Sequence, residues 1–351
     1  MRIGILTTSF PRHADDYAGS FVGDRARQLL AEGHAVDVLA AGDGVAAREL
    51  EHARLTVTRI APHADLHAAG LFYGGGAPEA LERGGLASWF AAARFSVLLA
   101  GATRTRAHRY DVIESHWLVP SALAALAAAP DHRDQRAYAH SGDVALLERI
   151  PLGRTIARRL ARGPIAIRFV SDALRSRFAA LAGVAVGTVE PLAPLAHEWA
   201  PRAGVDGARR RQLGLTRPLV LAVGRLVPIK GHDRLLHACA RVQSTAPDRA
   251  GALDVVILGD GPERARLGRL ADELGVRLRL PGFVPRAEVA RWLRAADVFV
   301  QPSIALANGR SEGAPFATAE ARAVGVPVLV ESDVARLADH LARIHTAATG
   351  V

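Results

Sequence analysis

Short apolar segments alternate with helical patterns along most of this chain, and that alternation restricts the fold more than any other feature. The first apolar segment, residues 3–8, predicts a buried strand, and a helical pattern follows at about 20–31. Gly33 ends that helix, and residues 36–40 form the next strand. A strand, a helix and a second strand in this order predict a crossover between parallel strands. We therefore expect an α/β protein with parallel sheets.

A second series of the same kind begins after a proline-rich interruption. Three prolines fall between residues 191 and 201, and the segment 202–211 is polar and basic. A length of 351 residues also favours two domains. We predict a first domain at 1–198 and a second at 206–351. Each resembles a Rossmann fold, so ligand-facing loops are expected at the carboxyl ends of the strands.

The charge and cysteine content narrow the function classes. The net charge of +9 is spread along the chain without a dense basic run or interleaved aromatic residues, which argues against nucleic-acid binding. An enzyme that handles phosphorylated ligands near an anionic membrane fits this charge better. Cys239 is the one cysteine, which excludes an internal disulfide framework and fits a reducing compartment. We expect a cytoplasmic protein, because the N-terminus runs directly into a strand without signal-peptide features.

The most apolar long segment, residues 85–102, raises the question of a membrane contact. Arg94 interrupts it, and the segment is short for a span. We therefore expect a surface helix or a shallow contact with a membrane.

The segment 303–330 carries the clearest candidate chemistry. It predicts a loop, a helix that begins near Pro315 and ends at Gly325, and a strand. Glu312 precedes that helix, and Glu320 lies inside it. Because a helix N-terminus attracts phosphate, Glu312 would lie beside an anion site, and Glu320 would be placed to accept hydrogen bonds from sugar hydroxyls. Taken alone, the segment also fits a capped surface helix with two solvated acids.

Two cations share the loop 224–231, which follows a buried strand. Arg225 and Lys230 suit a pyrophosphate at the carboxyl end of that strand. The loop is not a P-loop, because no glycine precedes Lys230 and no serine or threonine follows it. Solvated surface charge is the equal alternative for this pair alone.

The first domain offers four further candidate residues near strand ends. Gly19 ends the first strand–helix loop, where a close approach of backbone to ligand favours glycine. His116 follows a strand, and His140 and Asp143 lie in the loop after another strand. A lone histidine is more often structural. The 14 histidines lack metal-ligand spacing and no Asp-x-Asp occurs, so we expect no bound metal. The absence of a G-x-S-x-G elbow argues against a serine hydrolase.

Taken in order, these segments resemble the GT-B glycosyltransferases of the large retaining family 4. In the first domain the resemblance rests on TSFP, GSFV, LLAEGHAVDVL, DVIESHW, AHSGDVALLERIP and FVSDALRSRF. In the second domain it rests on LAVGRLVPIKG, VVILGDGPE, LPGFVPRAEVARWLRAADVFVQPS and SEGAPFATAEARAVGVPVLV. Glu312 and Glu320 match the E-x7-E signature of the family. The SFP opening and SHW are similar to bacterial enzymes that build cell-surface polysaccharides.

The resemblance implies two Rossmann-like domains facing across a cleft and a metal-independent transfer with retention at the anomeric carbon. The donor would be a nucleoside-diphosphate sugar, with no further cofactor, and the acceptor lipid-linked or saccharide. The working location would be the cytoplasm, with peripheral contact to the inner membrane, and front-face transfer is favoured. Acceptor choice is expected in the loop 61–86.

The resemblance also assigns site residues by position. Arg225 and Lys230 would neutralise the donor pyrophosphate, and Glu320 would hold the ribose hydroxyls. The residues implied in catalysis are Glu312, His116, Arg225 and Lys230. Those implied in donor binding are Gly19, Arg225, Lys230, Phe283, Val284, Glu312, Gly313, Ala314, Pro315, Phe316 and Glu320. His140 and Asp143 are the acceptor-side candidates.

The chain departs from the family pattern after Val330. Glu331 and Ser332 lead directly to a helix that Asp333 can cap. The apolar stripe of that helix consists of Val334, Leu337, Leu341 and Ile344. It resembles the late C-terminal helix of the family with the preceding strand and helices deleted, so we expect a second domain shortened after 330. One alternative is a degenerate, non-catalytic GT-B paralogue that binds nucleotide or a protein partner. A GT-B sugar-nucleotide epimerase is a second alternative.

Overall fold

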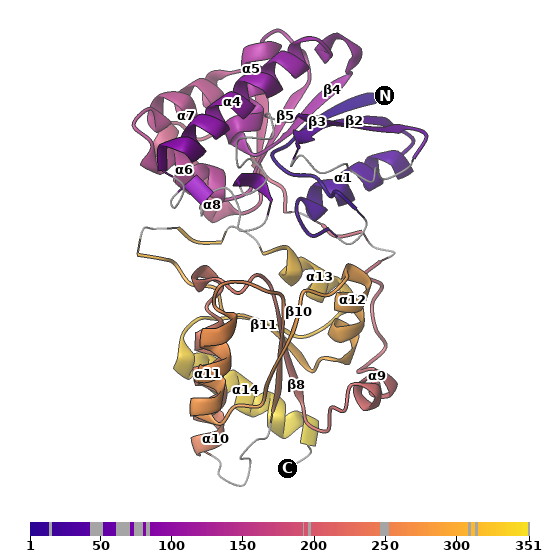
Figure 1. Ribbon diagram of the computed structural model, residues 1–351, viewed down its shortest axis with the longest axis vertical. Coiled ribbons are helices and arrows are strands. Elements are labelled where there is room, and N and C mark those ends of the chain that lie inside the picture. Colours follow the sequence, from indigo (N-terminus) through magenta and orange to yellow (C-terminus); the bar gives the residue numbers. More distant parts are fainter. Residues whose placement is uncertain are drawn as a thin grey trace. The chain divides into compact units, whose positions relative to one another are not determined.

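The computed structural model divides the chain into two compact units, Met1–Leu192 and Ala193–Val351. Each unit is an α/β structure in its own right (Figure 1). The structure describes residues 1–13, 16–42, 52–60, 71–73, 80–81, 85–191, 193–195, 198–245, 253–307, 310–312 and 315–349.

The first unit contains a parallel sheet with the strand order β3-β2-β1-β4-β5-β6-β7. Its strands are β1 (Arg2–Leu6), β2 (Ala35–Ala41), β3 (Leu55–Ile60), β4 (Val112–His116), β5 (Gln135–Ala139), β6 (Ile165–Phe169) and β7 (Thr188–Val189). The strand order reverses between β1 and β4, where Leu6 pairs with Ser115. Loops on the two sides of such a reversal diverge and leave a crevice for ligands at the carboxyl ends of the strands. The parallel sheet predicted from the alternating pattern is confirmed.

Helices cover both faces of this sheet (Figure 1). They are α1 (Ser20–Ala31), α4 (Gly85–Arg104), η1 (Ala107–Arg109), η2 (Leu118–Ala122), α5 (Leu123–Ala128), α6 (Gly142–Arg149), α7 (Gly153–Arg162) and α8 (Asp172–Ala182). Side chains alternate between the faces along β1. Ile5 therefore packs with α1, whereas Leu6 packs with α4.

The second unit contains a parallel sheet with the order β10-β9-β8-β11-β12. Its strands are β8 (Leu219–Val223), β9 (Asp254–Leu258), β10 (Leu278–Gly282), β11 (Val298–Gln301) and β12 (Val328–Val330). Its helices are α9 (Gly207–Gln212), η3 (Pro228–Lys230), α10 (His232–Thr245), α11 (Arg264–Leu274), α12 (Arg286–Ala295), α13 (Phe316–Val324) and α14 (Val334–Thr349). Helices α10, α11 and α14 share one apolar core, and α12 and α13 share the other. Cys239 is fully buried in the first of these cores, and burial raises the pKa of its thiol to about 12.

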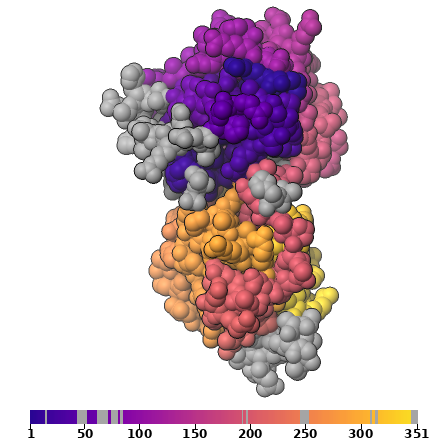
Figure 2. Space-filling view, turned by 90° about the vertical axis from the view of Figure 1, so that its right-hand side faces the viewer, coloured from indigo at the N-terminus to yellow at the C-terminus, as the bar shows by residue number. Residues whose placement is uncertain are grey.

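The division into units falls before the boundary predicted between 198 and 206. Trp199, only 1% exposed, packs in the core of the second unit. The Arg202 guanidinium donates hydrogen bonds to the carbonyl groups of Arg294 (2.9 Å) and Ala296 (2.6 Å). Figure 2 shows α9, in salmon, beside the orange α12 on the surface of the second unit. The segment after Ala193 is therefore packed on the second unit, although its prolines gave it the pattern of a linker.

The helix expected after residue 330 is α14, and it packs against α10. Leu337 and Leu341 are fully buried in the shared core, while Val334 and Ile344 are partly buried against it. This confirms the predicted apolar stripe. The preceding strand, β12, pairs in parallel with β11 at Val300 and Leu329.

Candidate functional site

In the second unit, two of the predicted donor-site residues, a lysine and a glutamate, lie together at the carboxyl ends of β8 and β11. Lys230 is the last residue of η3, in the loop after β8, and Glu312 lies in the segment after β11. Lys230 Nζ is 2.6 Å from Glu312 Oε1, and the two side chains are 13% and 19% exposed. This ion pair is largely shielded from water, so its attraction is screened less than that of a surface pair.

Two neutral side chains complete the shell around Glu312. Gln301 Nε2 donates a hydrogen bond to Glu312 Oε2 at 3.0 Å, and the Ser303 hydroxyl donates to the same oxygen. Both donors belong to the end of β11 and the residues just after it. The sequence pattern did not single out either residue. Their position at the end of a buried strand was the available signal.

Gly231 explains how the Lys230 loop comes so close to the segment after β11. Its φ of +62° lies in the left-handed region. A Cβ at this position would lie 2.1 Å from the carbonyl oxygen of Pro302. Only glycine allows both the backbone conformation and this approach. The loop therefore holds Lys230 against Glu312 by a backbone requirement, not by side-chain packing alone.

Arg225 opens the same loop and is partly buried. The next residue, Leu226, donates its N–H to the carbonyl of Asp260 at 2.9 Å, in the loop after β9. Glu263 donates its N–H back to the Leu226 carbonyl at 3.1 Å. These bonds brace the loop of Arg225 and Lys230 against the neighbouring strand-end loop.

Glu320 lies inside α13, where it is 8% exposed. Arg286, at the start of α12, places Nη2 3.3 Å from Glu320 Oε1. The Arg286 guanidinium lies over the rings of Trp199, at 5.1 Å, and Phe316, at 5.7 Å. A carboxylate oriented in this way can accept hydrogen bonds in a defined direction. Arg286 was not among the residues predicted from the sequence, because its partner Glu320 lies 34 positions further along the chain.

In the second unit, the other residues predicted to bind the donor belong to the loop after β10 and to the start of α13. Phe283, between β10 and α12, is 48% exposed, and Val284 packs partly against the core. Pro315 is the residue before α13, one position earlier than its predicted place in the first turn, because its ψ of 121° is extended. Phe316 begins that helix. Gly313 and Ala314 lie outside the described residues, as does most of the predicted acceptor loop 61–86.

In the first unit, His116 and His140 form a pair. His116 is the last residue of β4, not the residue after a strand, and its Nδ1 is 3.1 Å from His140 Nε2. The Tyr138 ring stacks on His116 with centroids 5.0 Å apart, and the Phe21 ring lies 4.7 Å from His140. His116 is fully buried, whereas His140 is partly exposed. His140 is thus the member of the pair that reaches the surface.

Both histidines are neutral at ordinary pH. Burial, together with the nearby charge of Arg25, lowers the pKa of His116 to about 3. Burial and the neighbouring His116 lower the pKa of His140 well below its usual value. In a neutral pair one ring donates the shared hydrogen bond and the other accepts it. The pair can therefore orient hydroxyl groups, but it does not supply a positive charge.

Asp143 is 2% exposed and is occupied by backbone groups. Its carboxylate accepts hydrogen bonds from the N–H groups of Leu118 (2.8 Å), Ser141 (3.1 Å) and Val144 (3.0 Å). Burial raises the pKa of Asp143, and these hydrogen bonds oppose that rise. In this structure the carboxylate joins the loops after β4 and β5, which supports the position of the histidine pair.

Gly19 lies at the start of α1 with a φ of +70°, and a Cβ there would be 2.3 Å from the Ser9 carbonyl oxygen. Helix α1 is tied to β4 by Arg25, whose Nε and Nη2 donate to the Glu114 carboxylate at 2.9 and 2.6 Å. Glu114 is fully buried and precedes His116 by two residues. This ion pair therefore fixes the Gly19 loop relative to the strand that carries His116.

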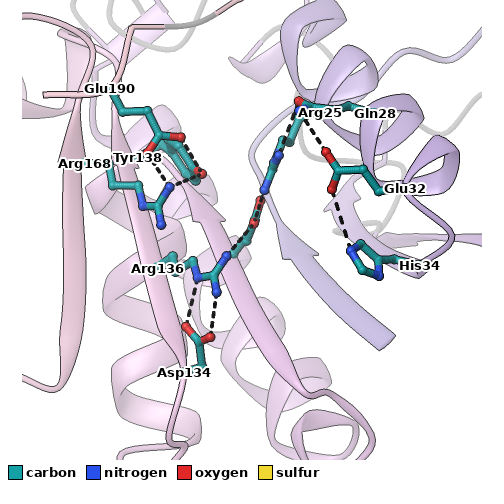
Figure 3. Close-up of polar contacts among 10 residues, drawn as sticks. Arg25, Gln28, Glu32, His34, Asp134, Arg136, Tyr138, Arg168 and Glu190 are labelled. Carbon is teal, nitrogen blue, oxygen red and sulfur yellow. Dashed lines mark hydrogen bonds and ion pairs between the residues drawn. The ribbon is translucent and has the colours of Figure 1, made fainter. Parts of the chain in front are cut away.

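The network around that ion pair continues over one face of the sheet (Figure 3). Arg136, on β5, places Nη1 3.7 Å from Glu114 and pairs with Asp134 at 2.7 Å. A second polar cluster lies on the neighbouring strand, where Arg168 donates to the Tyr138 hydroxyl at 3.2 Å. Because Tyr138 also stacks on His116, this second cluster adjoins the histidine pair.

Among the described residues, no group of three or more His, Cys, Asp or Glu side chains is placed to hold a metal ion. Of the helices that the structure describes, α4 alone is long and apolar enough to cross a membrane by length and composition. Only 17% of its most apolar 18-residue stretch is buried.

Comparisons with known proteins give a consistent result. The family described as Glycosyl transferases group 1 matches residues 208–341. A D-inositol 3-phosphate glycosyltransferase of Frankia alni is 31% identical over 328 residues, which cover 88% of this chain and 76% of that protein. A GDP-mannose-dependent alpha-(1-6)-phosphatidylinositol monomannoside mannosyltransferase of Mycolicibacterium smegmatis is 34% identical over 186 residues. That match covers 51% of this chain and about half, 47%, of the relative.

Solved structures extend the likeness over both units. Sucrose-phosphate synthase from Thermosynechococcus elongatus has a TM-score of 0.71 at 18% identity and covers 99% of this chain and 90% of its own. Anabaena HepE, solved with UDP and glucose, has a TM-score of 0.68 at 20% identity with the same coverage. At such identities the likeness shows the fold, and it confirms the GT-B class expected from the sequence.

Proposed function

Because the chain belongs to the group 1 glycosyltransferases, we propose that it transfers a sugar from a nucleoside-diphosphate sugar to a cell-envelope or polysaccharide acceptor. The observation that carries the proposal is the shielded Lys230–Glu312 pair at the carboxyl ends of two parallel strands. HepE, which has a similar fold, was solved with UDP-glucose, and this supports a nucleotide-sugar donor here.

The donor would be held by groups from several strand-end loops. Lys230 and Arg225 would face the pyrophosphate, and the N-terminus of α13, including Pro315 and Phe316, would add backbone N–H groups. Gly313 and Ala314 belong to the same proposed phosphate contact. In the first unit, Gly19 would belong to the same proposed donor contact, in a loop whose close backbone approach in the structure is to the Ser9 carbonyl.

Two glutamates would recognise the ribose and the donor sugar, and the loop after β10 would recognise the nucleobase. Glu320, oriented by Arg286, would accept hydrogen bonds from the ribose hydroxyls. Phe283 and Val284 would meet the nucleobase. Glu312 would contact the donor sugar. His116 and His140, as a neutral pair, would orient hydroxyl groups of the donor and the acceptor.

We propose a front-face transfer with retention. The bond between the anomeric carbon and the β-phosphate oxygen breaks, and a bond from the acceptor oxygen forms on the same face of the sugar. The acceptor proton passes to the departing phosphate oxygen. Glu312 is a poor candidate for a covalent nucleophile, because Lys230, Gln301 and Ser303 already engage its carboxylate.

Lys230 and Arg225 would stabilise the negative charge that develops on the leaving group, so the transfer would need no metal ion. The proposed setting is the cytoplasm or the inner face of the membrane. Asp143 supports the loop of the acceptor side in this scheme.

Release of nucleoside diphosphate from a panel of UDP- and GDP-sugars, measured with a chelator present, tests the proposal. Lys230→Ala and Glu312→Ala should each lower turnover by about a hundredfold to a thousandfold, the usual effect of removing one preorganised charge or donor. Arg269→Ala, which removes an exposed arginine of α11, is the matched control and should keep wild-type turnover. Wild-type turnover in both site variants would refute the site assignment. Nucleotide-dependent thermal stabilisation without turnover on any donor would instead support the non-catalytic alternative.

A further inference from the structure

Helix α4 presents a large apolar face to solvent. Leu86 is 89% exposed, Phe90 63% and Val97 71%, and these residues recur at helical spacing. Trp89 and Leu98, at 41% and 37%, flank the same stripe. Contiguous exposed apolar side chains of this size mark an interaction surface more often than ordinary protein surface.

The opposite side of α4 belongs to the protein core. Phe95 and Leu99 are fully buried and pack with Leu6 and Ile113 of the first sheet. A helix anchored in this way lies on the domain and does not leave it to span a bilayer. Its exposed stripe is therefore a surface feature of the folded first unit.

The neighbouring helices of the same layer are basic and carry no acids. Helix α4 packs against α5, and α5 packs against α7, on the side of the sheet away from α1 (Figure 1). None of the three helices contains an aspartate or a glutamate. Their arginines are Arg94, Arg104, Arg154, Arg158, Arg159 and Arg162.

The four arginines of α7 are exposed and uncompensated. None of them forms an ion pair or a side-chain hydrogen bond with any described residue. By contrast, Arg175 and Arg177 on the adjacent α8 pair with Asp172 and Glu148. Just before α7, Leu152 is 66% exposed. The outward surface of α4, α5 and α7 thus combines an apolar stripe with unpaired positive charge.

We propose that this outward surface of α4, α5 and α7 docks on an anionic lipid membrane. Leu86, Phe90 and Val97 would enter the boundary between headgroups and acyl chains, while the arginines of α7 contact anionic headgroups. A second copy of the chain is a poorer occupant. In a two-fold dimer the same patch faces itself, so six arginines would meet six arginines without an acid from these helices.

The surface extends the proposed function, because a lipid-linked acceptor would be presented at such a membrane. The proposed membrane surface and the proposed donor site consist of different residues, so an experiment can refute either proposal without the other. Flotation with vesicles requires no nucleotide sugar, and nucleoside diphosphate release in solution requires no vesicle.

The test is flotation of the purified chain with vesicles of phosphatidylcholine containing phosphatidylglycerol, compared with phosphatidylcholine alone. The wild type should float with the anionic vesicles, less so at high salt. Arg154→Gln with Arg158→Gln should weaken partition by about fivefold for each arginine lost. Arg269→Gln with Arg343→Gln removes the same charge from exposed positions in the second unit and should change partition less than about twofold.

The apolar stripe has its own variant, Leu86→Ser with Phe90→Ser, which should weaken partition by roughly tenfold or more. Val205→Ser, at a residue 41% exposed in the second unit, is its control. Wild-type failure to float overturns the proposal, and so does an equal loss in the control pairs. A wild-type dimer that the serine variant converts to monomers, without any change in flotation, assigns the surface to a second copy and also overturns it. An unchanged midpoint of thermal unfolding shows that the variants fold.

Discussion

Lys230 and Glu312 were predicted separately, and the structure makes them one ion pair, so their substitutions should not be additive. At 2.6 Å the gross attraction of two unit charges is about 6 kcal/mol at an effective dielectric constant of about 20. Loss of hydration offsets much of this attraction, because the side chains are only 13% and 19% exposed. We therefore expect a coupling free energy of about 1–3 kcal/mol between the two residues.

The single variants should differ in a defined direction. Lys230→Ala leaves Glu312 with its hydrogen bonds from Gln301 and Ser303. Glu312→Ala leaves three donors without their shared acceptor. The free energy of unfolding should therefore fall further in Glu312→Ala than in Lys230→Ala. The double variant should lose less than the sum of the two, by the coupling.

The measurement is a double-mutant cycle on the unfolding transition of the second unit, followed by calorimetry without ligand. Asp172 and Arg175 of α8 provide the control pair, measured by a second cycle on the unfolding transition of the first unit. Their separation, 2.7 Å, is nearly the same, but their side chains are 70% and 44% exposed. That pair should couple by less than about 0.5 kcal/mol. A Lys230–Glu312 coupling within about 0.5 kcal/mol of zero would refute the reasoning, because it would show that the shielded pair does not form in solution.

Two further predictions concern the strained loop and the buried histidines. Gly19→Ala places a Cβ 2.3 Å from the Ser9 carbonyl at a φ of +70°, so the first unit should lose about 1–3 kcal/mol of stability, measured by urea unfolding; an unchanged midpoint would contradict the geometry. Burial lowers the pKa of both His116 and His232 to about 3, below the usual value near 6.5 of an unfolded chain. Because the unfolded state then binds more protons, stability is complete above about pH 6.5 and falls toward pH 3, by about 1.4 kcal/mol per pH unit for each histidine. The test is the slope of the unfolding free energy of the second unit against pH, which reports the number of protons bound on unfolding. In His232→Leu this slope should correspond to one proton fewer than in the wild type. An unchanged slope would argue against a neutral His232.

The sequence predicted most of the fold, because its signals are local. The alternation of strands and helices follows from periodicity within a few residues, and it located β1, α1, β2 and α13 closely. The apolar stripe of α14 was equally readable, since burial of Leu337 and Leu341 follows from their spacing. The proline-rich segment gave no sign that Trp199 is buried, because that burial depends on partners in α12 and α13 and not on its neighbours in the chain.

The order of residues along the chain already places particular chemical groups at the strand ends, including Lys230, Glu312 and His116. Their pairing depends on the folded arrangement of the strands. Glu312 is held by Lys230, Glu320 by Arg286, and His116 by His140. The physical reason is that strand order and register bring together residues that are far apart in the chain. Local patterns specify the elements, but only the assembled sheet specifies which loop ends meet and which charges are neutralised.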